Sequence, residues 1–272
     1  IGAHMIVTEP MSNFRQLSEK YGDRIAFTGT MDTRVLLAGS KDDIFKEVEK
    51  QINIQGHQAS AIFDIGDEFC ETSKLNGAEA IISFTLADSV FKNIEMAAKL
   101  SIPIVEGTTG WYDELNRLET VENVSILYSP NFSIGVYRFT QLVEHAAKLM
   151  GLHPEYDSYL HEFHHSGKAD SPSGTAKKLA SAVLDNMPNK DKIFVETSHD
   201  VIDPKALHVT STRVGRVEGE HIVGFDSTAD DITLKHTAHS REGFAAGSVR
   251  AAEWIAGKSG IFTMDDFMSD MF

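Results

Sequence analysis

The chain has 272 residues, of which 42% are hydrophobic, so it can bury one large core or two moderate ones. Its formal net charge of −15, without a dense basic patch, argues against nucleic acid or an acidic membrane surface as a partner. No apolar run approaches the ~20 residues that span a bilayer, and Cys70 is the single cysteine. We therefore expect a globular, cytoplasmic protein in a reducing compartment.

Short apolar runs alternate with helical patterns in the first half of the chain. The opening residues 1–5 resemble a cloning remnant, so we leave them out of the fold. From residue 34 onward the spacing of strands and helices predicts crossover connections and a mostly parallel sheet covered on both faces, a Rossmann-like, doubly wound α/β domain. The expected strands are 35–39, 59–64, 78–84, 102–106 and 124–128, and the expected helices are 42–51, 87–100 and 111–120.

The pattern changes beyond residue 131, where strand-like runs follow one another without intervening helices. This predicts an open mixed sheet in a second, α+β domain. We expect the last helix to pack back on the first domain. The domains are then 1–133 completed by 243–272, which binds a dinucleotide, and 134–242, which binds the substrate. The expected strands are 157–164, 208–213, 220–227 and 231–238, and the expected helices are 135–150, 175–187 and 245–256.

Small polar loops follow three of the expected parallel strands, at the edge where open sheets of this kind bind nucleotides. Each loop alone is an ordinary connection between a strand and a helix. Three such loops at one edge favour a cofactor that approaches the backbone closely. The candidate cofactor contacts are Phe84, Gly107, Thr108, Thr109, Ser129, Pro130, Asn131 and Phe132.

Two further candidates lie at the ends of the first two expected strands. Asp64 occupies the position where an acidic side chain hydrogen-bonds ribose hydroxyls, and residues 65–68 offer no Arg or Lys for a 2′-phosphate, which favours NADH over NADPH. Gly39 is the only glycine left of a G-x-G-x-x-G turn, and two acids follow it. This departure leaves open a catalytically impaired homologue that only binds nucleotide.

Residues His161-Glu162-Phe163-His164-His165 match the zinc-peptidase pattern H-E-x-x-H. On a helix the two outer histidines lie about 6 Å apart in rise, but on a strand they lie about 13 Å apart and cannot share a metal ion. The flanking tyrosines and Gly167 favour a strand. We therefore expect no metal site from this motif, and a zinc hydrolase that uses His161, Glu162 and His165 is the disfavoured alternative.

The same stretch leads into a predicted helix start that is suited to an anion. His164, His165 and Lys168 are potential proton donors. Gly174 and Thr175 begin a helix whose unpaired N–H groups attract a carboxylate. Each side chain taken singly fits a structural imidazole or a solvated lysine. Together the five residues predict a site for reducing a dicarboxylate.

The run of residues 162–176, E-F-H-H-S-G-K-A-D-S-P-S-G-T-A, resembles the signature of the 4-hydroxy-tetrahydrodipicolinate reductase family of the diaminopimelate route to lysine. The resemblance covers about residues 56–270, whereas residues 13–53 look more like a segment of the uroporphyrinogen decarboxylase family. Further segments similar to the reductase family in order and spacing are Ser83-Phe84-Thr85, Gly107-Thr108-Thr109-Gly110, Ser129 to Val136, Gly219-Glu220-His221 and His236 to Arg241.

The resemblance implies a reductase that uses NADH or NADPH to convert a cyclic dicarboxylate into tetrahydrodipicolinate. It implies His164 and Lys168 as proton donors, and His165, Gly174 and Thr175 as substrate contacts. It also implies a second domain that forms a homotetramer. The loops after the parallel strands would contact the cofactor, with Asp64 at the ribose.

Overall fold

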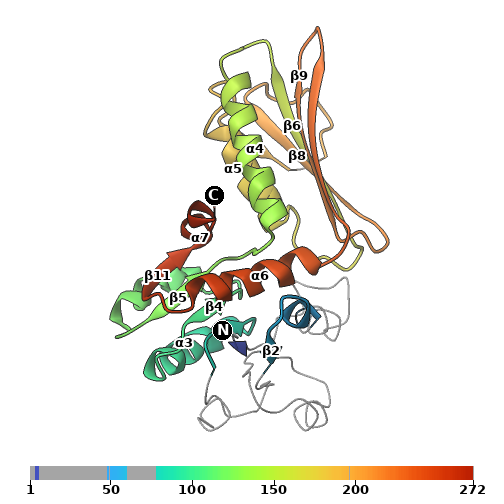
Figure 1. Ribbon diagram of the computed structural model, residues 1–272. Helices are drawn as coiled ribbons and strands as arrows, with labels where there is room; N and C mark the ends of the chain where they lie inside the picture. The colour runs from blue at the N-terminus through green and yellow to red at the C-terminus, as the bar shows by residue number, and fades with distance from the viewer. Residues whose placement is uncertain (1–3, 6–47, 49, 60–77, 196, 272) are drawn as a thin grey trace. The chain divides into compact units, whose positions relative to one another are not determined.

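The computed structural model describes residues 4–5, 48, 50–59, 78–195 and 197–271 (Figure 1). The chain divides into two compact units, one made of residues 1–133 and 241–272 and the other of residues 134–240. None of the helices in the described ranges is long and apolar enough to cross a membrane.

The first unit contains a four-stranded parallel sheet in the order β11-β5-β4-β3. The apolar runs of β3 and β4 are fully buried, as expected of a parallel sheet with covered faces. This confirms the predicted Rossmann-like α/β architecture. Its strands are β3 (Ile81–Ser83), β4 (Ile104–Glu106), β5 (Ser125–Tyr128) and β11 (Gly260–Thr263), and its helices are α3 (Val90–Lys99), α6 (Glu242–Ile255) and α7 (Met264–Asp270).

Some short elements of the first unit differ from the prediction. The expected helix 111–120 is a 3₁₀ helix, Tyr112–Thr120, because Leu118 is its one buried residue and no apolar stripe holds an α-helix. Residues 4–5 form a strand, β1 (His4–Met5), that pairs in parallel with β2 (Gln58–Ala59), although we had left them out of the fold. The expected strand 35–39, most of the strand 59–64 and the start of the helix 42–51 lie outside the described residues.

The second unit contains a five-stranded sheet in the order β10-β9-β6-β8-β7. The predicted open mixed sheet is confirmed, although β7 was not among the four expected strands. The central strand β6 is parallel to β8 and antiparallel to β9. Two helices, α4 (Ile134–Met150) and α5 (Gly174–Leu184), lie side by side on the sheet (Figure 1). The strands are β6 (Asp157–His164), β7 (Lys192–Phe194), β8 (Ala206–Arg213), β9 (Gly219–Asp226) and β10 (Asp231–Ala238).

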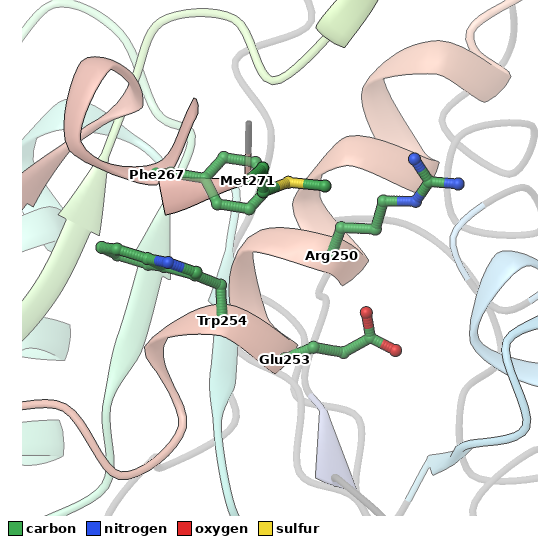
Figure 2. A pocket seen from close by; sticks show the side chains of 5 residues that line it. All are labelled: Arg250, Glu253, Trp254, Phe267 and Met271. Atoms are coloured by element: carbon green, nitrogen blue, oxygen red, sulfur yellow. The ribbon is translucent and has the colours of Figure 1, made fainter. Parts of the chain in front are cut away.

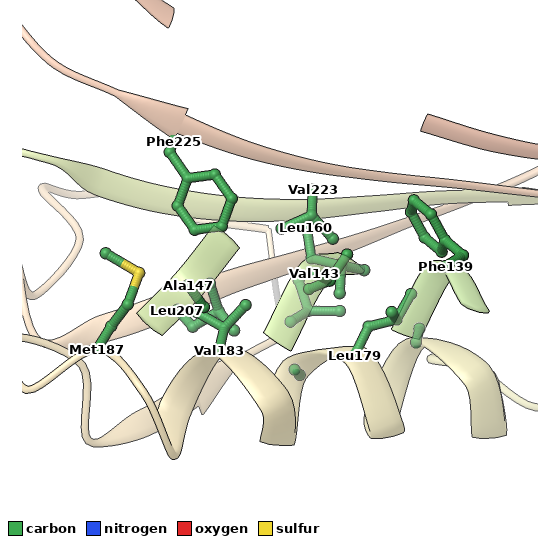
Figure 3. Packing of buried hydrophobic residues seen from close by; sticks show 13 residues of the cluster. Phe139, Val143, Ala147, Leu160, Leu179, Val183, Met187, Leu207, Val223 and Phe225 are labelled. Carbon is green, nitrogen blue, oxygen red and sulfur yellow. The ribbon is translucent and has the colours of Figure 1, made fainter. Parts of the chain in front are cut away.

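The core of the second unit lies between this sheet and its two helices. Figure 3 shows Leu179 and Val183 of α5 pointing toward the strands that carry Leu160 and Val223. Alternate residues of β6 face this core because successive side chains of a strand point to opposite faces. Toward the carboxyl end of β6 the same face carries Glu162 and His164 instead of apolar residues. The hydrophobic core therefore ends where a buried polar cluster begins.

Candidate active site

The buried polar cluster of the second unit is built around Glu162, whose side chain has no exposed surface. In the sheet register Glu162 lies directly opposite Ser211 of β8 on one side and His221 of β9 on the other. His164 follows two positions later on β6 and so faces the same way. The pairing of three strands thus brings one carboxylate and two imidazoles together.

The two carboxylate oxygens of Glu162 have different surroundings. Oε1 accepts hydrogen bonds from the Ser173 N–H (3.0 Å), the Ser211 hydroxyl (2.7 Å) and the Arg213 guanidinium (2.8 Å). Oε2 lies 3.3 Å from His164 Nε2 and 3.5 Å from His221 Nε2. Burial by itself raises the pKa of Glu162, but the two imidazoles, Ser173 and Arg213 hold that pKa well below its usual range. The group is an ionised carboxylate.

Arg213 also fixes the loop that connects β6 to α5. Its guanidinium donates to the carbonyl oxygens of Asp170 (2.6 Å) and Lys168 (3.3 Å). The Lys168 ammonium, 10% exposed, lies 2.6 Å from the Asp170 carboxylate. His165, at the start of the loop, is buried. The loop is therefore held against the end of the sheet by the arginine that also neutralises Glu162.

Helix α5 begins with an open set of backbone donors. Ser173 is its N-cap and accepts the Ala176 N–H at 3.1 Å. The N–H groups of Gly174 and Thr175 make no hydrogen bond to any residue that the structure describes. A Cβ at Gly174 would meet nothing within 4 Å, so the backbone there is open to a ligand. The predicted helix start is confirmed, and its first N–H groups remain available to a ligand.

The first four residues of the zinc-peptidase motif lie on β6, the strand that was predicted, and His165 follows it. His161 faces away from Glu162 and is hydrogen-bonded to Thr210, so the two do not lie on one face as the zinc motif requires. A different trio, Glu162, His164 and His221, has ligand atoms within 4.8 Å of one another. Arg213 places a fixed positive charge on the same carboxylate, and this favours protons over a metal cation there.

The first unit brings the three predicted cofactor loops to one edge of its sheet. Ser83 of β3, Glu106 of β4 and Tyr128 of β5 are neighbours in the register, so the loops that follow them begin side by side. The Gly107 N–H donates to the Ser83 carbonyl at 2.8 Å, and the Ser129 N–H donates to the Glu106 carbonyl at 3.1 Å.

Hydrogen bonds that involve Glu106 fix the loop that follows β4. This buried carboxyl accepts the Thr108 N–H at 2.8 Å, and the Thr108 hydroxyl accepts the Thr85 N–H at 2.7 Å. The Trp111 indole donates to the Thr108 carbonyl at 2.9 Å. Burial raises the pKa of Glu106 to about 7, although hydrogen bonds from Ser83 and Thr108 oppose the rise.

Comparison with known proteins decides the family. Residues 26–132 match the family model described as dihydrodipicolinate reductase, N-terminus, and residues 135–268 match the C-terminus model. A 4-hydroxy-tetrahydrodipicolinate reductase from Archaeoglobus fulgidus is 38% identical over 258 residues, covering 86% of this chain and 99% of the relative. One from Methanosarcina barkeri is 34% identical and covers 81% and 93%. The chain belongs to the dihydrodipicolinate reductase family.

A solved structure supports the same fold. The dipicolinate-bound dihydrodipicolinate reductase from Paenisporosarcina sp. TG-14 superposes with a TM-score of 0.60 at 15% identity, covering 97% of this chain and 98% of that one. The reductase resemblance of the sequence is confirmed. The family match begins at residue 26, so it includes most of the segment 13–53 that looks like a decarboxylase fragment.

The described loops after β3, β4 and β5 lie at the edge where an open parallel sheet binds a nucleotide, and NADH or NADPH is the cofactor that this family implies. The Phe84 ring lies over Gly107, where a Cβ would come within 2.1 Å of it, and its edge meets Phe132 at 6.4 Å. Ser129 and Asn131 bond within their own loop. Thr109 has no hydrogen-bond partner among the described residues, which leaves its polar groups to a ligand. Pro130, which follows Ser129 in the loop after β5, is exposed. Gly39 and Asp64 lie outside the described residues.

Several site residues of this reductase were missed in the sequence. Glu162 entered only as the base of a zinc motif, and Arg213, Ser211 and Asp170 received no role. The spacing of two between Glu162 and His164, and between Ser211 and Arg213, was the available signal, because it puts both members of each pair on one face of a strand. That spacing does not indicate which strands pair with β6.

A cavity of about 330 Å³ lies elsewhere in the first unit, against α6 and α7 (Figure 2). None of the predicted site residues lines it. The Trp254 indole donates to Asp270 at 3.2 Å, and the Lys258 ammonium lies 4.2 Å from the centre of the indole ring. We interpret the cavity as a gap in helix packing. It is lined by Arg250, Glu253, Trp254, Phe267 and Met271.

The raised pKa of Glu106 predicts a stability that falls as pH rises. Between pH 4.5 and about 7 the folded state binds more protons at this group than the unfolded state, so the free energy of unfolding decreases across that range, by up to about 3 kcal/mol. Glu106→Gln keeps an acceptor for the Thr108 N–H and does not titrate. We expect its stability relative to wild type to increase from pH 5 to pH 8 in thermal melts.

The control for this experiment is Glu119→Gln, the same change at an exposed position of the first unit. It should show no such trend. A difference between Glu106→Gln and wild type that does not vary with pH would contradict the role given to the buried carboxyl.

Proposed function

We propose that this protein is a 4-hydroxy-tetrahydrodipicolinate reductase that supplies tetrahydrodipicolinate to lysine and diaminopimelate synthesis. The substrate is a cyclic dicarboxylate that loses its hydroxyl as water and is reduced at a conjugated C–N system. The observation that carries the proposal is the single loop that joins His164, Lys168 and the open start of α5, in a chain of this family. Residues 134–242 would bind the substrate, and 1–133 with 243–272 the dinucleotide.

His164 and Lys168 are the proposed proton donors. Bound NADH or NADPH supplies the hydride. The atom that becomes basic on reduction takes a proton from one of these side chains, which both lie on the loop side of the buried cluster. His165 is proposed as a further substrate contact.

The two carboxylates of the substrate would be held by different kinds of donor. One would bind the N–H groups at Gly174 and Thr175 together with the Thr175 hydroxyl. The other would pair with the Lys168 ammonium, which exchanges Asp170 for the ligand. Two contacts, one to each carboxylate, orient the ring for reduction.

Loss of either proposed proton donor should slow turnover and spare cofactor binding. We expect His164→Ala and Lys168→Ala each to lower kcat by about 10²–10⁴, because the proton must then come from water. Steady-state kinetics with the cyclic dicarboxylate, and cofactor titration by fluorescence, would measure both effects. His145→Ala and Lys148→Ala, exposed on α4, are the matched controls. Wild-type kcat in either test variant would refute its assignment.

We propose that NADH is preferred over NADPH. Asp64 at the expected ribose position and the absence of Arg and Lys from residues 65–68 support this, because nothing there would neutralise a 2′-phosphate. Fluorescence titration should give the lower Kd for NADH. Tighter binding of NADPH would reverse the proposal, and binding of neither below millimolar concentration would favour the impaired homologue.

We also propose a cytoplasmic homotetramer, assembled through the second unit. The single cysteine suits a reducing compartment. On the face of the sheet turned away from α4 and α5, the Tyr159 ring lies across Gly224 and is 38% exposed, and Phe163 and Ile222 are partly exposed. The described helices α4 and α5 pack against the other face, which carries Leu160, Val223 and Phe225. An uncovered apolar sheet face is typical of an interface.

Light scattering should give the mass of four chains for the wild type. Ile222→Asp, which places a charge on the uncovered face, should yield smaller species, whereas Leu152→Asp, at an exposed position outside the sheet, should not. A wild-type mass of one chain would contradict the tetramer.

A further inference from the structure

We propose that Glu162 is a positioning residue for His164: its buried carboxylate holds the proton of His164 on Nε2 and thereby assigns Nδ1 to the substrate. The inference rests on the proposed function for the role of His164. The position of the proton in the resting protein can be tested without any activity.

The carboxylate of Glu162 cannot turn to another orientation. Its Oε1 is occupied by three donors, from the start of α5 and from two positions of β8. Its Oε2 is buried and makes no hydrogen bond to a described residue. The Nε2 atoms of His164 and His221 lie 3.3 and 3.5 Å from it. A buried carboxylate oxygen without a donor costs about 1–3 kcal/mol or more, so we infer that an imidazole N–H turns toward Oε2.

This requirement selects one tautomer of His164. An ionised carboxylate is acceptor-only, and a neutral imidazole has one donor and one acceptor nitrogen. If Nε2 lacked a proton, two lone pairs would face each other 3.3 Å apart in a buried place. The proton on Nε2 leaves Nδ1 as the atom that gives or takes a proton in the reaction.

The strand beside His164 is shaped to seat the ring in this orientation. Gly219, at the start of β9, lies against the imidazole, and a Cβ there would come within 3.0 Å of Cε1 and 3.4 Å of Nδ1. A side chain there would press on Cε1, the ring atom between the two nitrogens. Glycine at this position therefore leaves room for the ring.

The other charged and titratable groups near Glu162 have partners besides its Oε2 atom. Burial lowers the pKa of His221, from β9, although its interaction with Glu162 opposes this shift, and its Nε2 also lies 3.3 Å from the Ser173 hydroxyl. Arg213, from β8, is bound to Oε1. On the loop, Lys168 is paired with Asp170.

Glu162→Gln is the decisive substitution, because it changes the charge and almost nothing else. The amide oxygen keeps the place of Oε1 and its three donors, so the NH₂ group takes the place of Oε2 and presents a hydrogen to His164 Nε2. The proton of His164 must then move to Nδ1. We expect kcat to fall by about 10²–10⁴, as for an imidazole held in the wrong tautomer, with little change in substrate KM.

The tautomer can be read directly by long-range ¹H–¹⁵N NMR of histidine-labelled protein, with His164 assigned from the signals that His164→Ala loses. We expect Nε2–H in the wild type and Nδ1–H in Glu162→Gln. A purely structural role for Glu162 would not move the proton. Glu162→Asp, which keeps the charge, should restore the Nε2–H tautomer and part of kcat.

Two further variants separate positioning from stability. Ser211→Ala removes a donor from Oε1 only, so it should lower the melting temperature and leave the tautomer unchanged. Glu144→Gln, exposed on α4, should change neither property. If Glu162→Gln does not fold, the wild-type spectrum still decides, because an Nδ1–H tautomer of His164 there overturns the proposal.

The possible outcomes distinguish this inference from the proposed function. A wild type that binds cofactor but reduces no cyclic dicarboxylate refutes the function, while its NMR spectrum still tests Glu162. An active wild type together with a Glu162→Gln variant of equal kcat refutes the positioning role. One equivalent of a divalent metal in the purified protein would overturn it as well, because the metal would replace the proton on Nε2.

Discussion

The arrangement of the second unit depends on keeping one buried negative charge satisfied. An ionised carboxylate taken out of water is tolerated only if donors surround it. Glu162 obtains them from both neighbouring strands, from the first turn of α5 and from its own strand. The register of β6 between β8 and β9 and the docking of α5 on the sheet each bring donors to this carboxylate. The position of the loop that carries Lys168 depends on it as well, because Arg213 binds both the carboxylate and the loop.

The first unit also contains a buried glutamate at the end of a strand, but the pKa of that glutamate is shifted in the opposite direction. Glu106 also ends a buried strand and accepts a backbone N–H from the loop that follows. Its partners are neutral hydroxyls and an amide, so burial dominates and raises its pKa to about 7. The partners of Glu162 include a guanidinium and two imidazoles, which lower the pKa instead. The charge of a buried glutamate is thus set by its neighbours and not by burial alone.

Much of the second unit could be predicted from local patterns. The strands 157–164 and 231–238 begin and end at the predicted residues, because their apolar and polar side chains alternate and turn residues flank them. Three short elements were missed, β7 in this unit and β11 and α7 in the first unit, because three to seven residues carry too little periodicity. For α7 a capping box of Thr263 and Asp266 was present as a signal.

The candidate site was predictable only where it is continuous in sequence. His164, Lys168 and the start of α5 lie within one stretch, and the helix start could be inferred from its capping residues. The partners of Glu162 on β8 and β9 come from positions about fifty residues away, and only the strand order brings them near. The sequence around Glu162 does not show which distant residues will pair with its carboxylate. The zinc interpretation was possible because those partners were unknown.

The energetics of the two ion pairs decide which cation a substrate carboxylate can recruit. Drawing Arg213 away would leave Glu162 as an uncompensated buried charge, a loss of about 3–5 kcal/mol. Drawing Lys168 away from Asp170 costs far less, because the Asp170 side chain is 42% exposed and water can replace the ammonium. Lys168 is therefore the exchangeable cation and Arg213 the fixed one. The loop can release its ammonium to a ligand while the cluster beneath it, with the proton of His164, stays in place.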